Sequence, residues 1–377
     1  MKKRLIAVIL ATVFIFSFAG CNNSEKVTSG DTSPSASDGT KDSGNSDSKL
    51  IGVSMPTKSL QRWNQDGTNM KNKLEAAGYK VDLQYAGDND IPTQVNQIEN
   101  MITNGCKVLV IVAIDGSSLT EVLKKAKEQN IPVVAYDRLI MNTDALSYYA
   151  TFDNLQVGEL QGKFIEEKLD LKNNKGPFNI EFFAGDPADN NATYFFKGAM
   201  NVLNPYIESG VLKVLSKQTT QAQVSTAKWK TEVAQSRMEN LITSNGYSPK
   251  GTKLDAVCCS NDSTAMGVTN ALVSAGYTKE NMPIITGQDC DKANVKNISQ
   301  GLQSMSVFKD TRALAEKVLA MVEAILKGTE PEINDTTSYN NGVAVIPSYL
   351  CPLDVATIDN YKKLLIDSGY YKESDIQ

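Results

Sequence analysis

The sequence predicts an α/β protein with two doubly wound parallel-sheet domains. Short apolar runs alternate with amphipathic stretches from Lys49 onward, which is the order of strands and helices in a parallel sheet covered on both faces. The alternation begins again near residue 178, which favours two similar units over one large sheet. A chain of 377 residues that is 41% hydrophobic is also long and apolar enough to form two cores.

The first unit is expected to alternate strictly between strands and helices. The expected strands span residues 50–55, 81–85, 108–114 and 131–136, and the expected helices span 63–77, 93–104 and 119–129. Val95, Ile98 and Ile102 show helical spacing in the second of these helices. Gly78 and Gly105 follow the first two helices, and glycine is a common residue at the end of a helix.

The second unit repeats this pattern. Its expected strands span residues 178–183, 212–216, 254–259, 283–285 and 305–308, and its expected helices span 192–203, 227–244, 263–275 and 293–300. A further helix over 156–168 precedes this unit. One helix over 311–326 and one strand over 343–346 follow it, which indicates that the chain crosses back between the domains.

Residues 1–20 are predicted to be a lipoprotein signal peptide. Basic residues begin the chain, and the apolar run over 5–16 is shorter than the ~20 residues that span a membrane. Small residues stand directly before Cys21, as in a bacterial lipobox, and predict cleavage and lipidation there. Residues 21–49 are mostly small and polar, which predicts a flexible linker. The alternative is a plain signal peptide with an incidental cysteine.

The charged and titratable residues exclude several classes of function. The chain has 38 Lys and Arg against 43 Asp and Glu, so it lacks the basic excess of a nucleic-acid-binding protein. It contains no histidine, which excludes Ser-His-Asp and Cys-His catalysis and His-ligated metals. No glycine-rich nucleotide motif follows a strand. We therefore expect no nucleic-acid partner, metal or cofactor, and an enzyme would need carboxylates, lysine, tyrosine or cysteine.

The cysteines after Cys21 are predicted to be buried apolar residues. They are Cys106, Cys258, Cys259, Cys290 and Cys351. Their number is odd, none forms a C-x-x-C pair, and three lie in apolar runs. Reactive or metal-binding thiols are the alternative.

Polar side chains follow the ends of the predicted strands in both units. These groups are Lys58, Arg62-Trp63, Asp137-Arg138, Asp189-Asn190-Asn191, Asn261-Asp262, Gln288-Asp289 and Lys309-Asp310. Ligands bind at the carboxyl ends of the strands in open parallel sheets. Carboxylates and amides accept hydrogen bonds from sugar hydroxyls, while arginine, lysine and asparagine donate to them. The pattern therefore predicts a site for a polyhydroxylated ligand.

Some of these residues also have a purely structural interpretation. The chain's two tryptophans, Trp63 and Trp229, can stack on the apolar face of a pyranose, but they can also anchor a helix start and pack in a helix core. Asp153, Asp262 and Asp310 each stand where a predicted helix begins, and we expect them to be caps. The alternative for Asp137-Arg138 is a mutual surface ion pair, and for Asp289 a turn.

These segments resemble the sugar-binding components of bacterial ABC importers, the type I periplasmic binding proteins. Within that family the chain is similar to the xylose-binding and multiple-monosaccharide-binding members. The matching segments are MPTKS (55–59), Arg62-Trp63, QIENM (97–101), AYDR (135–138), YATFDN (149–154), GPFNIE (176–181), DNNA (189–192), GQD (287–289) and FKDT (308–311). The resemblance extends from about residue 51 to the C-terminus.

The resemblance implies a sugar cleft between two lobes joined by three hinge strands. It implies one lobe of residues 50–152 and 308–338, and another of residues 153–307 and 339–377. The implied sugar contacts are Arg62, Trp63, Asp137, Arg138, Asn191, Trp229, Asn261, Asp289 and Lys309, with Lys58 as an additional contact. Asn261 stands where the multiple-sugar members have an aspartate and the xylose-binding member an asparagine, so xylose, glucose, galactose and arabinose all stay open.

The sequence thus favours a lipid-anchored, extracytoplasmic monosaccharide receptor that is monomeric and delivers its ligand to an ABC permease. A chemosensory receptor is a further partner that the resemblance leaves open. The alternative is a sugar-processing enzyme with Asp137 and Asp289 as acid and base, since glycosidases can work without histidine. A transcription repressor of the same fold would need a DNA-binding head, and residues 1–49 are predicted to be a signal and linker instead.

Overall fold

The structure is a computed structural model that describes residues 49–88 and 90–376. The predicted signal peptide (1–20), the predicted lipid site Cys21 and all of the predicted linker except Lys49 lie outside the described residues. Within the described ranges, no helix is long and apolar enough to cross a membrane.

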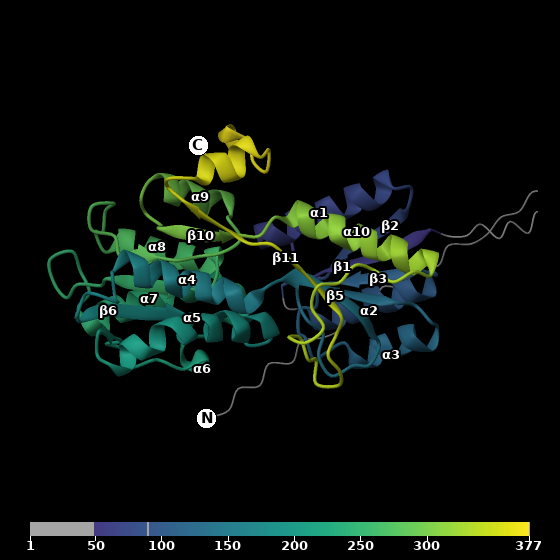
Figure 1. Ribbon diagram of the computed structural model, residues 1–377, viewed down its shortest axis with the longest axis horizontal. Helices are drawn as coiled ribbons and strands as arrows, with labels where there is room; N and C mark the ends of the chain where they lie inside the picture. The colour runs from purple at the N-terminus through teal and green to yellow at the C-terminus, as the bar shows by residue number, and fades with distance from the viewer. Residues whose placement is uncertain (1–48, 89, 377) are drawn as a thin grey trace, which may run out of the picture. The chain divides into compact units, whose positions relative to one another are not determined.

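The first lobe contains a six-stranded parallel sheet in the order β11-β5-β4-β3-β1-β2. Its strands are β1 (Leu50–Met55), β2 (Lys80–Tyr85), β3 (Val108–Ile111), β4 (Val133–Tyr136), β5 (Leu146–Phe152) and β11 (Ser348–Cys351). Helices α1 (Gln61–Ala76) and α10 (Thr311–Lys327) cover one face, and α2 (Ile91–Thr103) and α3 (Thr120–Glu128) cover the other (Figure 1). The central strands β3 and β4 are apolar and fully buried because helices lie on both sides of them.

The second lobe contains a four-stranded parallel sheet in the order β7-β6-β8-β9. Its strands are β6 (Phe178–Phe183), β7 (Leu212–Lys213), β8 (Ala256–Cys259) and β9 (Ile284–Ile285). Helices α7 (Thr231–Asn245) and α8 (Asp262–Ser274) pack in one core, while α4 (Asn154–Lys168), α5 (Asn190–Glu208) and the short α6 (Gln221–Val224) contribute to another. Strand β10 (Met305–Phe308) follows α9 (Lys292–Ser299) and pairs antiparallel with β12 (Asp354–Thr357).

The chain passes between the lobes after β5, after β10 and again between β11 and β12, as the expected three-strand hinge requires. One expected boundary is wrong, because residues 339–377 do not all belong to the second lobe. Strand β11 extends the first lobe's sheet beside β5, and Tyr339 packs edge-on against Tyr149 with ring centroids 5.1 Å apart. Residues 343–346 form no strand; the strand lies further on, at Ser348–Cys351.

Two predicted helices of the second lobe also differ from the structure. Helix α5 continues to Glu208 with Pro205 inside it, where the prediction ended the helix before that proline. The predicted helix 227–244 is divided: Ala227–Trp229 form a single 3₁₀ turn, and α7 begins at Thr231. Lys228 and Trp229 have left-handed backbone angles, φ 58° and 55°, which interrupt the helix. Strand β5 was not predicted from the sequence, because its polar residues hide the apolar pattern.

Candidate functional site

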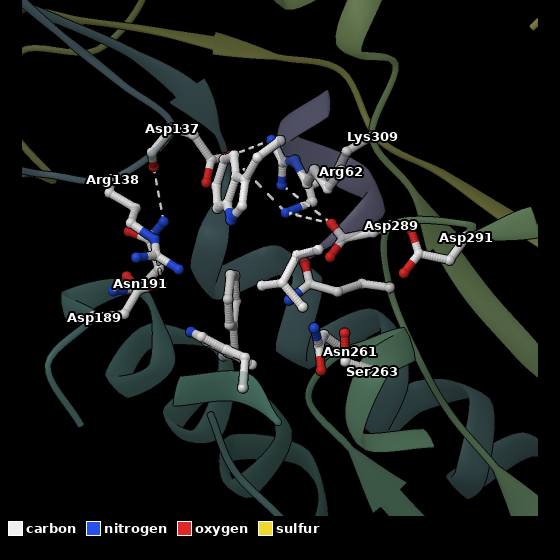
Figure 2. Close-up of a pocket in the computed structure, with 15 residues that line it drawn as sticks. Arg62, Asp137, Arg138, Asp189, Asn191, Asn261, Ser263, Asp289, Asp291 and Lys309 are labelled. Carbon is white, nitrogen blue, oxygen red and sulfur yellow. Dashed lines mark hydrogen bonds and ion pairs between the residues drawn. The ribbon is translucent and has the colours of Figure 1, made fainter. Parts of the chain in front are cut away.

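A pocket with about 400 Å³ of empty space, part of it open to solvent, lies where the strand ends of the two lobes meet. Its walls consist of Leu60, Arg62, Trp63, Asp137, Arg138, Asp189, Asn191, Phe195, Trp229, Asn261, Ser263, Gln288, Asp289, Asp291 and Lys309. Arg62 and Trp63 come from the first turn of α1, and Asp137 and Arg138 directly follow β4. Figure 2 shows Arg138 and Asp189 on one side of the pocket, with Asp289, Asp291 and Lys309 on the other.

Arg62 is the centre of the charge network in this pocket. Its Nε lies 2.9 Å from Oδ2 of Asp66, one helical turn further along α1, and its Nη2 pairs with Asp137. Its Nη1 lies 3.1 Å from Oδ1 of Asp289, which belongs to the other lobe. Burial alone would lower the pKa of Arg62, but the surrounding carboxylates raise it well above its ordinary value. The guanidinium therefore stays charged and joins the two lobes.

Asp137 is held as a carboxylate by its neighbours. Burial opposes ionisation, but Arg62, Lys309 and Arg138 outweigh it, and the pKa of Asp137 falls below its ordinary value. Its backbone φ is 60°, an uncommon angle for a residue with a side chain. Its carbonyl oxygen accepts hydrogen bonds from Tyr149 Oη at 2.6 Å and Asn191 Nδ2 at 2.7 Å. These bonds support the unusual turn and set the direction of the carboxylate.

Lys309 supplies a second buried cation at the crossing after β10. Its Nζ lies 2.8 Å from Oδ1 of Asp289 and 3.9 Å from Oδ2 of Asp137. Only 3% of the residue is exposed. Arg62, Lys309, Asp137 and Asp289 thus form a charge-balanced cluster of two cations and two anions. Such a cluster offers both donors and acceptors to a neutral ligand.

Arg138 is oriented by contacts on several sides. Its Nη1 donates to the carbonyl oxygens of Ala113 at 3.1 Å and Ile114 at 3.3 Å. Its Nε lies 2.9 Å from Oδ2 of Asp189, in the geometry of an ion pair rather than an aligned hydrogen bond. Its guanidinium also lies 5.0 Å from the ring of Trp63. The surface ion pair between Asp137 and Arg138 is therefore the wrong alternative, since both are buried and pair elsewhere.

The two tryptophans give the pocket flat apolar surfaces with free donors. Trp63 and Trp229 are each 4% exposed, and their indole Nε1 atoms are buried without a hydrogen-bond partner among the described residues. The ring of Trp229 lies against Gly185, where a Cβ atom would come within 1.9 Å of it. Phe195 packs edge-on against Trp229 with ring centroids 6.3 Å apart. A ligand with hydroxyl oxygens and apolar C–H faces would satisfy both properties.

The residue that caps the N-terminus of α8 is not the predicted one. Asn261, not Asp262, caps this helix, because its Oδ1 accepts from the backbone N–H of Thr264 at 3.0 Å. Asp262 is buried and accepts instead from Gln303 and Ser306 at 2.9 Å. The predicted caps Asp153 and Asp310 are confirmed, since they accept from the backbone N–H groups of Gln156 and Arg312.

Asp291 lies in the pocket wall with a carboxyl group that no described residue neutralises directly. Its Oδ1 is buried without a hydrogen-bond partner, and its backbone N–H donates to Oδ2 of Asp262 at 2.9 Å. Burial and the neighbouring Asp289 raise the pKa of Asp291 to about 7, against the opposing effects of Arg62 and Lys309. Burial thus favours the protonated form of this carboxyl group, in which it can donate a hydrogen bond.

The structure brings all but one of the predicted contact residues into this pocket. The exception is Lys58, which is exposed and places its Nζ 4.9 Å over the ring of Tyr85, outside the pocket wall. Six pocket residues were not among the predicted sugar contacts, although Asp189 and Gln288 stood in the predicted strand-end groups: Leu60, Asp189, Phe195, Ser263, Gln288 and Asp291. Phe195 follows Asn191 by one helical turn, and Gln288 precedes the predicted Asp289. Spacing could therefore have identified them.

The remaining thiols agree with their predicted role. Cys106, Cys258, Cys259, Cys290 and Cys351 are free and buried. Burial raises the pKa of Cys258 and Cys351 to about 12, so these thiols stay protonated. Across residues 49–88 and 90–376, no cluster of three or more Cys, Asp or Glu is arranged to hold a metal ion.

Comparison with known proteins gives consistent results. A model of the periplasmic binding protein domain matches residues 51–330. The multiple sugar-binding periplasmic receptor ChvE of Rhizobium radiobacter is 48% identical, over 88% of this chain and 93% of its own length. The D-xylose-binding periplasmic protein of Escherichia coli (strain K12) is 39% identical, over 86% of this chain and 92% of its own length. The crystal structure of an ABC transporter solute binding protein from Clostridium phytofermentans with bound β-D-glucose is 61% identical, with a TM-score of 0.84 over 87% of this chain and 100% of that one.

Proposed function

The chain belongs to the periplasmic binding protein domain family, and on this premise we propose that it binds a monosaccharide in the pocket between its lobes. The observation that supports this most directly is the charge-balanced cluster of Arg62, Lys309, Asp137 and Asp289 beside two indole N–H groups without partners. A neutral polyol satisfies these groups without adding charge. The relatives' ligands, glucose and xylose, point to an aldopyranose.

The proposed sugar contacts are the nine predicted residues of the pocket together with Asp189 and Asp291. They come from both lobes, so a bound sugar would hold the lobes together and bending of the three crossings would release it. An ABC permease would recognise this closed, liganded state, because the ligand shifts the equilibrium towards it. A chemosensory receptor that recognises the same closed, liganded state is a second proposed partner.

The first test is titration of the purified protein with aldoses. We expect D-glucose, D-xylose, D-galactose or L-arabinose to change tryptophan fluorescence saturably, because Trp63 and Trp229 line the pocket and are the chain's two tryptophans. Calorimetry should give a stoichiometry of one sugar per chain. A protein that is folded by circular dichroism yet responds to none of these sugars would refute the proposal.

The alternative of a sugar-processing enzyme is not supported, and the chain is a binding protein rather than an enzyme. The relatives are solute-binding proteins. The proposed acid and base, Asp137 and Asp289, both pair with Arg62 and Lys309. Because the pKa of Asp137 is lowered, that carboxylate is a poor proton donor.

We further propose that Cys21 carries a lipid that anchors the protein outside the cytoplasm. Small residues before Cys21 and the polar segment after it support this proposal. When the native chain is expressed in a bacterial host, it should incorporate radiolabelled palmitate and sediment with the membranes. Cys21→Ser should abolish labelling and leave sugar binding unchanged, because the pocket begins only at Leu60. Labelling that survives Cys21→Ser would contradict a lipid at this position.

A further inference from the structure

The C-terminal segment of the second lobe contacts two elements that supply residues to the pocket wall, one from each lobe. Tyr371 lies in this segment, four residues after the short helical stretch Lys362–Asp367, and is 4% exposed. Its ring belongs to a core with Cys290 and Phe308 of the same lobe. Its hydroxyl lies between α1 of the first lobe and the loop that follows β9. Tyr371 does not line the pocket itself.

The hydrogen bonds of this hydroxyl use its full capacity. It donates to the carbonyl oxygen of Cys290 at 2.9 Å. It accepts from Nε2 of Gln61 at 2.9 Å and from Nε2 of Gln65 at 3.0 Å, two residues one turn apart on α1. A phenol has one donor and two acceptor positions, so these three bonds leave none free. One oxygen atom thus joins α1 of the first lobe to the β9 loop of the second.

Both of these elements hold proposed sugar contacts. Gln61 directly precedes Arg62 and Trp63, while Cys290 lies between Asp289 and Asp291. Asp289 and Cys290 have φ angles of 95° and 52°, which are strained for residues with side chains and persist only where contacts hold them. A second link lies beside Tyr371, since the backbone N–H of Lys292 donates to Oε1 of Gln61 at 3.2 Å.

We propose that Tyr371 is a positioning residue that holds the closed arrangement of the lobes around the sugar. This inference rests on the proposed sugar binding. The Tyr371 hydroxyl stabilises the state in which Arg62 meets Asp289, without touching the sugar. Loss of this hydroxyl therefore speeds the opening that releases the ligand and has little effect on the encounter with it.

Stopped-flow kinetics with D-glucose and D-xylose test this role in Tyr371→Phe. We expect the sugar dissociation rate to rise about tenfold and the association rate to change less than about twofold, because two hydrogen bonds between the lobes are lost. Tyr361→Phe is the matched control, since this tyrosine lies in the same core and its hydroxyl makes no hydrogen bond to any described residue. Thermal unfolding of the ligand-free variants checks that all of them are folded.

A double-mutant cycle distinguishes a role of Tyr371 in holding the two lobes together from a role in supporting only the loop after β9. Gln65→Met removes one of the two donors on α1 and leaves both the bond from Tyr371 to Cys290 and the link between Lys292 and Gln61 in place. If Tyr371 acts between the lobes, this change speeds dissociation in the same direction as Tyr371→Phe, and combining the two changes adds little. The proposal would be overturned if Gln65→Met or Tyr371→Phe released the sugar at the native dissociation rate. If the native protein itself bound no aldose, the proposed function would fail instead.

Discussion

Replacing Asp289 by alanine is expected to weaken aldose binding about 100-fold while leaving the protein folded. The change removes the carboxylate that lies 3.1 Å from Arg62 and 2.8 Å from Lys309, and leaves two buried cations short of a partner. Truncating one partner of a buried charge pair costs about 2–5 kcal/mol in binding systems, which spans roughly 30-fold to several thousand-fold in affinity. The proposed contact between Asp289 and a sugar hydroxyl would be lost as well.

Calorimetric titration with D-glucose and D-xylose measures this effect. Asp359→Ala is the control, because Asp359 is an exposed aspartate of the same lobe whose side chain makes no hydrogen bond or ion pair with the described residues. Asp289→Asn keeps the shape of the side chain and removes its charge, so it should also bind weakly. Native affinity in both Asp289 variants, with native unfolding temperatures, would exclude this carboxylate from the site.

Replacing Asp291 by asparagine is expected to stabilise the ligand-free protein at alkaline pH. The pKa of Asp291 is raised from 3.8 to about 7, chiefly by burial and then by Asp289. A carboxyl group with a raised folded-state pKa contributes most to stability below its unfolded value, and that contribution is lost as the pH rises through about 7. Asparagine cannot ionise, so the variant avoids this loss.

Urea unfolding at pH 4, 6 and 8 without sugar measures this difference. The free energy of unfolding of Asp291→Asn, relative to the native chain, should increase between pH 4 and pH 8 by on the order of 1–4 kcal/mol. Asp359→Asn serves as the exposed control and should follow the native pH profile. A difference between Asp291→Asn and the native chain that is constant across this range would show that Asp291 is ionised without penalty. Asp262, whose carboxylate faces the backbone of Asp291, would then be the group to test next.

Much of the fold could be predicted because its local signals are strong. Strands β1, β6 and β10 begin and end where the apolar runs do, at Leu50–Met55, Phe178–Phe183 and Met305–Phe308. Elements whose boundaries depend on distant contacts were missed or misplaced. Strand β11 forms only because β5 offers it an edge, and the turn at Trp229 depends on a hydrogen bond from the Lys228 backbone to Asp186 at 2.9 Å.

Most of the polar residues of the pocket could also be predicted from the sequence, because their positions follow from the direction of the strands. Parallel strands place their carboxyl ends at one edge of their sheet, so Asp137 in the first lobe and Asn261 in the second were each expected at the ligand-binding edge of their own sheet. Asp291 was not selected because nothing in its local sequence distinguishes it from a surface aspartate. Its place in the pocket depends on the strained backbone at Asp289 and Cys290, which neighbouring elements hold.

The sequence by itself determined the α/β class, the absence of histidine chemistry and most of the polar groups at the strand ends, because these depend on residue type and spacing. Only the tertiary structure decided how the charges pair. Arg62 contacts Asp66, Asp137 and Asp289, which lie 4, 75 and 227 positions away along the chain. The pair with Asp66 lies within one turn of α1, the pair with Asp137 depends on packing inside the first lobe, and the pair with Asp289 depends on the packing of the two lobes. Lys58 lies outside the pocket wall and Asp291 lies in it, which tertiary packing also decides.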